Sequence, residues 1–266
     1  MFRLLGLGLC VLTLLLAGCG GAPQESNSSS TSSSSTSTAG SSSSQSGPAI
    51  PANAVTISNI QAQTSWSSCS SSCAGQAGTN AVYSMEQPIA SPSVSGSAIK
   101  FDITGGTPWA DALWWKQQGG NDAMTHFVYS MSFYLDNPTA AQALEFNVNQ
   151  NAGGNRYEYA TQCDIKGSHH WRIWPHSQMH WLDTGVSCPE PAANTWNQLT
   201  WEFSRNSSNQ VVWEAVTLNG VRSTINQAFD SYPATGSGID VAFQMDSDGG
   251  PTPWSVWVDN ISLTEW

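Results

Sequence analysis

Three polar side chains, Glu145, Asn147 and Asn149, alternate with apolar residues in the segment 142–150. If this segment is a β-strand, the apolar residues face the core and the three polar side chains project together from the opposite face. A carboxyl group beside two amides can bind hydroxyl groups, and the carboxyl can also supply acid–base chemistry. Such a row is either a solvated outer face or the floor of a binding groove.

Tryptophan is abundant, with 13 residues in a chain of which only 10% is charged. Trp114 and Trp115 are adjacent in a predicted strand, so they point to opposite faces and one leaves the core; Trp115 is our candidate. Trp171, Trp174 and Trp181 flank a His-rich loop. An exposed indole packs against the C–H face of a pyranose ring, while amides and carboxylates bind its hydroxyls. We expect ligand contacts from this set, with core packing as the alternative for each member.

The charge balance limits the partners of this protein. The chain has 19 acidic and 8 basic residues, a formal net charge of −11, and abundant neutral hydrogen-bonding side chains. Because such a chain repels phosphate backbones, nucleic acid is excluded as a partner. Flat aromatic groups with neutral hydrogen-bonding groups favour a neutral sugar, and we expect no required cofactor.

Residues 51–266 alternate with period two, with Gly, Pro, Asn and Asp between segments, and no stretch sustains a helical period over three turns. We predict strands near 55–61, 81–86, 98–103, 111–117, 126–135, 142–150, 156–163, 169–174, 196–204, 211–219, 222–229, 239–246 and 254–264. So many strands without crossover helices predict an all-β fold of two packed antiparallel sheets. We expect one domain and a monomer.

The N-terminal segment has the features of an export signal. Residues 1–19 combine Arg3, a short apolar stretch and small residues before Cys19. The quartet Leu16-Ala17-Gly18-Cys19 resembles the lipobox of bacterial lipoproteins, which implies that Cys19 is lipidated. Residues 20–50 are mostly Ser, Thr, Gly and Ala, which is typical of a flexible tether. We therefore expect an extracytoplasmic protein, lipid-anchored to a membrane at the outer membrane or cell surface.

Four cysteines follow the tether: Cys69, Cys73, Cys163 and Cys188. In an oxidising compartment, four cysteines imply two disulfides, and we expect Cys69–Cys73 and Cys163–Cys188. A four-cysteine zinc site is the alternative, although neither pair has the Cys-x-x-Cys spacing that is usual for structural zinc.

The segment 144–150 resembles the catalytic strand of laminarinase-type glucanases in the concanavalin A-like superfamily. In that strand Glu-x-Asp-x-x-Glu supplies a nucleophile, a helper and an acid/base. Glu145 stands at the nucleophile position, whereas Asn147 and Gln150 replace the other two carboxyls. The resemblance implies a concanavalin A-like jelly roll. An amide cannot deliver a proton, so catalysis would need a carboxyl from another strand, with Glu158 and Glu202 as candidates.

The segment 254–266 resembles the closing strand of jelly-roll carbohydrate-binding modules. In those modules a matching Asp helps to hold a structural calcium ion, and here that residue is Asp259. The alternative is an Asp that accepts hydrogen bonds in a turn.

Together these features predict a tethered β-sandwich that binds a polysaccharide or oligosaccharide in a groove. The groove residues would be Glu145, Asn147, Asn149, Trp115, Trp171, Trp174 and Trp181. Two alternatives remain: a glycoside hydrolase or polysaccharide lyase that uses Glu145, with Glu158 as partner, and a structural or adhesive surface protein without a sugar site.

Overall fold

Two β-sheets make up the fold of the part of the chain that the computed structural model describes, residues 47–70 and 81–266. Sheet A contains β1 (Val55–Ile57), β3 (Val82–Ile89), β4 (Ala98–Thr104), β6 (His126–Leu135), β11 (Trp196–Arg205), β12 (Gln210–Leu218), β13 (Val221–Asp230) and β16 (Trp254–Glu265). Sheet B contains β2 (Ser67–Ser70), β5 (Pro108–Gly119), β7 (Ala141–Ala152), β8 (Asn155–Cys163), β9 (His170–Trp174), β10 (Leu182–Ser187), β14 (Tyr232–Pro233) and β15 (Gly238–Asp248). Short 3₁₀ turns lie at Ile60–Ala62 and Pro138–Ala140.

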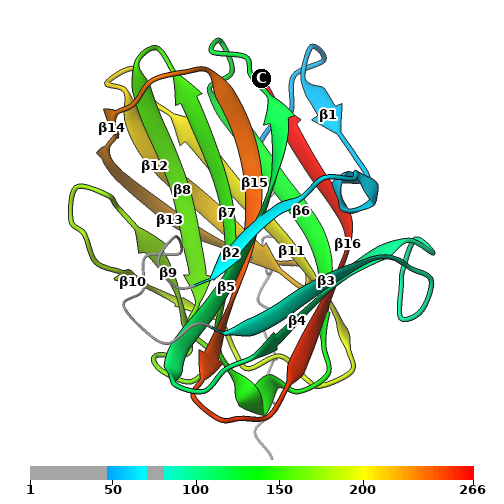
Figure 1. Ribbon diagram of the computed structural model, residues 1–266. Coiled ribbons are helices and arrows are strands. Elements are labelled where there is room, and N and C mark those ends of the chain that lie inside the picture. The colour runs from blue at the N-terminus through cyan, green and yellow to red at the C-terminus, as the bar shows by residue number, and fades with distance from the viewer. Residues whose placement is uncertain (1–46, 71–80) are drawn as a thin grey trace, which may run out of the picture. The chain divides into compact units, whose positions relative to one another are not determined.

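The strand order places segments that are distant in sequence side by side (Figure 1). Sheet A has the order β13-β12-β11-β6-β16-β4-β3, with β1 paired to β16, and sheet B has the order β10-β9-β8-β7-β15-β5-β2, with β14 paired to β8. In sheet B the C-terminal strand β15 pairs antiparallel with both β7 and β5. The predicted sandwich of two antiparallel sheets is confirmed.

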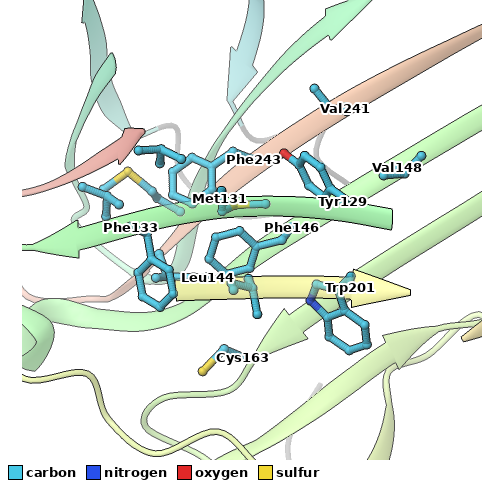
Figure 2. Packing of buried hydrophobic residues seen from close by; sticks show 14 of the residues in the cluster. Tyr129, Met131, Phe133, Leu144, Phe146, Val148, Cys163, Trp201, Val241 and Phe243 are labelled. Atoms are coloured by element: carbon cyan, nitrogen blue, oxygen red, sulfur yellow. The ribbon is translucent and has the colours of Figure 1, made fainter. Parts of the chain in front are cut away.

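The hydrophobic core lies between the two sheets (Figure 2). Aromatic side chains of opposite sheets meet there: Phe133 of β6 contacts Phe146 of β7 with ring centroids 5.4 Å apart, and Phe101 of β4 contacts Phe243 of β15 at 4.9 Å. Each buried side chain of this size contributes about 1.5–3 kcal/mol of transfer free energy. Because strand side chains alternate, Phe146 in the core fixes the direction of its neighbours on β7 toward the outer face of sheet B.

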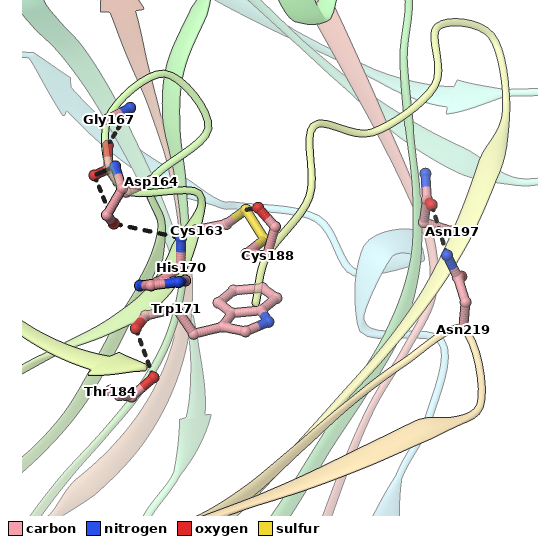
Figure 3. The surroundings of a disulfide bond; sticks show 10 residues. Cys163, Asp164, Gly167, His170, Trp171, Thr184, Cys188, Asn197 and Asn219 are labelled. Carbon is pink, nitrogen blue, oxygen red and sulfur yellow. Dashed lines mark hydrogen bonds between the residues drawn. A yellow bond between two sulfur atoms is a disulfide. The ribbon is translucent and has the colours of Figure 1, made fainter. Parts of the chain in front are cut away.

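A disulfide joins Cys163, at the end of β8, to Cys188, just after β10 (Figure 3). Both cysteines are buried, and the loop that they close carries β9 and β10 at the edge of sheet B. The predicted Cys163–Cys188 bridge is confirmed.

Replacing both cysteines by alanine tests the contribution of this bridge. The cysteines are 25 residues apart, and closing a loop of that size in the unfolded chain predicts that the double variant loses about 3 kcal/mol of unfolding free energy. Urea denaturation of both proteins under non-reducing conditions measures the difference. An unchanged unfolding free energy would contradict the prediction.

Several sequence predictions concern residues outside the described ranges. The lipobox that ends at Cys19, residues 20–46 of the tether, and Cys73 are among them. The lipid anchor and the Cys69–Cys73 bridge therefore stay predictions. Within residues 47–70 and 81–266, no helix has the length and apolar character needed to cross a membrane.

Candidate functional site

The outer face of sheet B carries the polar row that the sequence predicts on β7. Glu145, Asn147 and Asn149 line a groove of about 570 Å³, within the range of ~300–1,000 Å³ that is typical of ligand sites. Side chains of β5, β8, β9 and β15 complete its walls and floor.

One line of residues, the trough row, crosses the groove floor from strand to strand. The antiparallel registers pair Trp115 with Ala242, Ala242 with Asn147, and Ala160 with Trp174. Between β7 and β8, Glu145 pairs with Gln162 and Val148 with Tyr159, and this register sets Asn147 opposite Ala160. From β5 to β9 the trough row is thus Trp115, Ala242, Asn147, Ala160 and Trp174. With strands about 4.8 Å apart, its four intervals span about 19 Å along the sheet.

Two rows of longer side chains flank the trough row. The amide row on one side consists of Leu113, Gln244, Glu145 and Gln162. The carboxylate row on the other side consists of Gln117, Asp240, Asn149 and Glu158. Because alanine has the shortest apolar side chain, the floor at Ala242 and Ala160 lies lower than both flanking rows. The result is a trough across the strands with a tryptophan at each end.

The two ends of the trough have different aromatic walls. Trp115 on β5 is partly exposed in the groove, while its neighbour Trp114 is buried in the core. At the other end, Trp174 of β9 packs edge to face against Trp181, with ring centroids 5.4 Å apart. Met179 stands beside them with 64% of its surface exposed. Both ends therefore offer apolar faces, as the sequence predicts for Trp115, Trp174 and Trp181.

Glu145 is held in place by amide groups and is only 7% exposed. Its Oε1 accepts hydrogen bonds from Gln162 Nε2 at 3.3 Å and Gln244 Nε2 at 3.1 Å, and its Oε2 accepts one from Asn147 Nδ2 at 3.3 Å. Burial raises the pKa of Glu145 well above its ordinary value, and the charge of Asp246 adds to this effect. The hydrogen bonds oppose the shift only in part. Glu145 therefore holds its proton more strongly than an exposed carboxyl group does.

Asp246 lies beside the amide row, two residues beyond Gln244 on the same face of β15, and is 1% exposed. It accepts hydrogen bonds from the same two amide nitrogens, Gln244 Nε2 at 2.9 Å and Gln162 Nε2 at 3.2 Å. The pKa of Asp246 is raised to about 7, chiefly by burial, with the charge of Asp111 directly opposite on β5 adding to the rise and the hydrogen bond from Gln244 opposing it. The amide row thus has a second, buried carboxyl group beside it that does not line the groove.

The carboxylate row has a spare hydrogen-bond acceptor. Asn149 donates to Asp240 Oδ1 at 2.8 Å, whereas Asn149 Oδ1 is buried and accepts no hydrogen bond from the described residues. Burial raises the pKa of Asp240, against the hydrogen bond from Asn149. Glu158 accepts a hydrogen bond from the Tyr232 hydroxyl at 3.2 Å and lies 3.5 Å from His176 Nδ1. The groove face of this row thus combines amide and carboxyl groups that can bind sugar hydroxyls.

The prediction that Trp171 contributes to the groove is wrong. Trp171 is fully buried and packs against Phe146 and Trp201 between the sheets. Trp171 and Trp174 are three positions apart on β9, so alternation sends them to opposite faces. Only Trp174 of this pair can reach a ligand.

The partner carboxyls predicted for Glu145 do not lie near it. Glu158 is opposite Asn149, four residues along β7, which is about 13 Å at a strand rise of about 3.3 Å. Retaining and inverting glycosidases hold their carboxyls ~5–5.5 Å and ~6.5–9.5 Å apart. Glu202 lies on β11 of sheet A, where Arg222 binds it at 2.7 Å. The carboxyl next to Glu145 is instead Asp246, through shared amides.

Asp259 has the contacts of a turn anchor and does not fit a calcium ligand. Its two oxygens accept hydrogen bonds from the hydroxyls of Ser93 and Ser95, the Gln61 amide, and the backbone N–H groups of Val94, Ser95 and Asn260. Calcium requires six to eight oxygen ligands, whereas this carboxylate is surrounded by donors. Within residues 47–70 and 81–266, no group of three or more His, Cys, Asp or Glu side chains is placed to hold a metal ion.

Apart from Glu158, sequence reasoning missed the contributions of β15 and β8 to the groove. These are Arg156, Ala160, Asp240, Ala242 and Gln244. A signal was present, because Asp240, Gln244 and Asp246 occupy alternate positions of a predicted strand and must share its face. Which strands flank β7 could not be read from that alternation.

Comparison with known proteins gives no family. No protein-family model and no curated protein matches the sequence. Among solved structures, the chain is similar to a family 11 carbohydrate-binding module from Clostridium thermocellum in complex with a β-1,3-1,4-mixed-linked tetrasaccharide, with 13% identity, 81% of this chain and 96% of that chain covered, and a TM-score of 0.41. It is also similar to peanut lectin (15% identity, 81% and 98% covered, TM-score 0.43) and to an alginate lyase in complex with an alginate trisaccharide (13% identity, 81% and 98% covered, TM-score 0.44). Similarities at this level carry no functional information, so the function is inferred from the groove itself.

Proposed function

We propose that the groove of sheet B binds a neutral polysaccharide or oligosaccharide. The trough row carries this proposal: an indole at each end of a lowered floor, with hydrogen-bonding rows on both sides. Pyranose rings present C–H faces that pack on indoles and hydroxyls that bind amides and carboxyls. A span of about 19 Å between β5 and β9 suits several sugar units in a chain that crosses the strands.

The charges around the trough favour a neutral sugar over a uronate. Asp240 and Glu158 face the groove, and Arg156 is the one basic residue among the described residues that line it. Asp246 adds a further, buried carboxyl beside the amide row. An anionic sugar chain would meet this excess of carboxyl groups with little compensation.

The same geometry favours binding over hydrolysis. Hydrolysis needs two carboxyls that both reach the glycosidic bond, one protonated and one ionised. Asp246 is the neighbour of Glu145, but its burial and its two hydrogen bonds from amides keep it from a ligand. A structural protein without a site is also less well supported, because a groove of about 570 Å³ with an indole at each end has the size and lining of a ligand site.

We also propose that a lipid anchor at Cys19 attaches the protein to a membrane. The lipobox resemblance and the Ser-rich segment up to residue 50 support a module that is held outside the cytoplasm on a tether. From there it would retain polysaccharide near the membrane as a monomer, without a required cofactor.

Calorimetric titration with a panel of soluble β-glucans and xylans tests the proposal, with a reducing-sugar assay in parallel. We expect binding to at least one glycan without release of reducing ends. Ala242→Phe fills the trough and should weaken that binding at least tenfold, since the aromatic ring occupies the space of the ligand.

Ala228→Phe is the matched control, because Ala228 is exposed on β13 of sheet A. Thermal unfolding verifies that both variants are folded, and Ala160→Phe replaces the first variant if it is not. Binding that persists in the folded groove variants would refute the location of the site, and release of reducing ends by the wild-type protein would favour a hydrolase.

A further inference from the structure

Glu145 and Asp246 are joined by two amide groups on neighbouring strands. Gln244 Nε2 is 3.1 Å from Glu145 Oε1 and 2.9 Å from Asp246 Oδ1. Gln162 Nε2 is 3.3 Å from Glu145 Oε1 and 3.2 Å from Asp246 Oδ2. The two amides from β15 and β8 therefore hold both carboxyls together, one lining the groove and one buried beside it.

The surroundings of this pair provide negative charge and no ion pair. Asp111 lies opposite Asp246 on β5, and Asp164 follows β8. Two basic groups at this end of sheet B are engaged elsewhere: Arg172, opposite Gln162 on β9, binds Asp164 at 2.6 Å, and Lys166 binds Asp248. Among the described residues, no cation forms an ion pair with either member of the pair. Full ionisation would place two negative charges side by side in a buried site.

From this arrangement, and resting on the proposed function, we propose that Glu145 and Asp246 act as a proton-linked pair that keeps a proton at neutral pH, and that glycan affinity falls as rising pH removes it. The raised pKa values of both groups agree with this arrangement.

The contacts of Glu145 explain the direction of the effect. Its Oε1 already accepts two hydrogen bonds, so the proton belongs on Oε2, which accepts only the 3.3 Å contact from Asn147. A protonated Oε2 is a donor for a sugar oxygen. A neutral ligand also excludes water from Glu145, which disfavours the ionised form further. Binding therefore takes up a proton, and affinity is full at low pH and is lost as pH rises.

Titration of the ligand-free full chain by ¹³C NMR of the side-chain carboxyls tests the pair directly. We expect at least one of the two groups to remain protonated at pH 7. In Asp246→Asn, Glu145 should titrate at lower pH because the neighbouring charge is gone. Gln162 Oε1 accepts no hydrogen bond from the described residues and can bind the new amide, so this variant should fold and its thermal midpoint should gain more at pH 8 than at pH 4.

The affinity is then measured by calorimetry from pH 5 to pH 9 with mixed-linkage β-glucan oligosaccharides and xylo-oligosaccharides. We expect at least a fivefold loss of affinity across this range in the wild-type protein and none in Glu145→Gln, which mimics the neutral form. Ordinary titration of both carboxyls, or an affinity that is equal at pH 5 and pH 9, would overturn the proposal. If no glycan binds at any pH, the proposed function falls together with the affinity effect, while the NMR titration still decides whether the proton-linked pair exists.

Discussion

Removing both end tryptophans, in Trp115→Ala/Trp174→Ala, should reduce the affinity for a bound glycan about 100-fold or more. A large aromatic anchor in a binding site is worth on the order of 2 kcal/mol, and each tenfold change in affinity corresponds to about 1.4 kcal/mol. The two rings lie at opposite ends of the trough row, about 19 Å apart, so their effects should add. Calorimetric titration of the single and double variants with the same oligosaccharide measures each contribution.

Trp257→Ala is the matched control for this prediction. Trp257 is also partly exposed, but it lies on β16 of sheet A, where Lys100 stands 5.3 Å above its ring. Its removal should leave affinity unchanged. Equal losses in the control and in the double variant would mean that the trough is not the site.

We expect a second large effect from Asp259→Ala, which should lower the free energy of unfolding by about 3 kcal/mol or more. The side chain accepts hydrogen bonds from the 93–95 turn, from Gln61 and from the backbone of β16, so its loss leaves several donors without a partner. An unsatisfied buried donor costs about 1–3 kcal/mol, and solvent can reach some of these groups after the change. Urea denaturation at pH 7 measures the loss of unfolding free energy.

The pH dependence of Asp259 gives a second measurement. Burial opposes its ionisation, but hydrogen bonds from Ser93 and Ser95 outweigh burial and lower the pKa of Asp259 below its ordinary value. Because the folded state favours the carboxylate, this stability is present above the unfolded pKa of ~3.8 and is lost as pH falls through the folded pKa. Asp230→Ala, which removes an exposed carboxylate with a single hydrogen bond from Gln210, is the control and should cost under 1 kcal/mol. Stabilisation of the wild-type protein by added calcium would contradict our description of the site.

The sequence alone determined those features that depend on a single strand. The alternation in 142–150 places Glu145, Asn147 and Asn149 on one outer face, because the pleat repeats every two residues whatever lies beside the strand. The same rule separates Trp115 from Trp114. The same alternation would also have excluded Trp171 from the groove, because Trp171 and Trp174 are three positions apart on one strand and therefore point to opposite faces.

The tertiary structure decided everything that depends on which strands are neighbours. Ala242 and Ala160 form a trough only because β15 and β8 flank β7 in one register, and that pairing joins segments up to about a hundred residues apart. The raised pKa of Glu145 has the same origin, because the side chains that bury it and the charge of Asp246 come from other strands. Asp259 resembles a calcium ligand in sequence, yet the turn at 93–95 surrounds it with donors. Side-chain direction is a local property of the backbone, whereas groove shape and protonation depend on groups that only folding brings together.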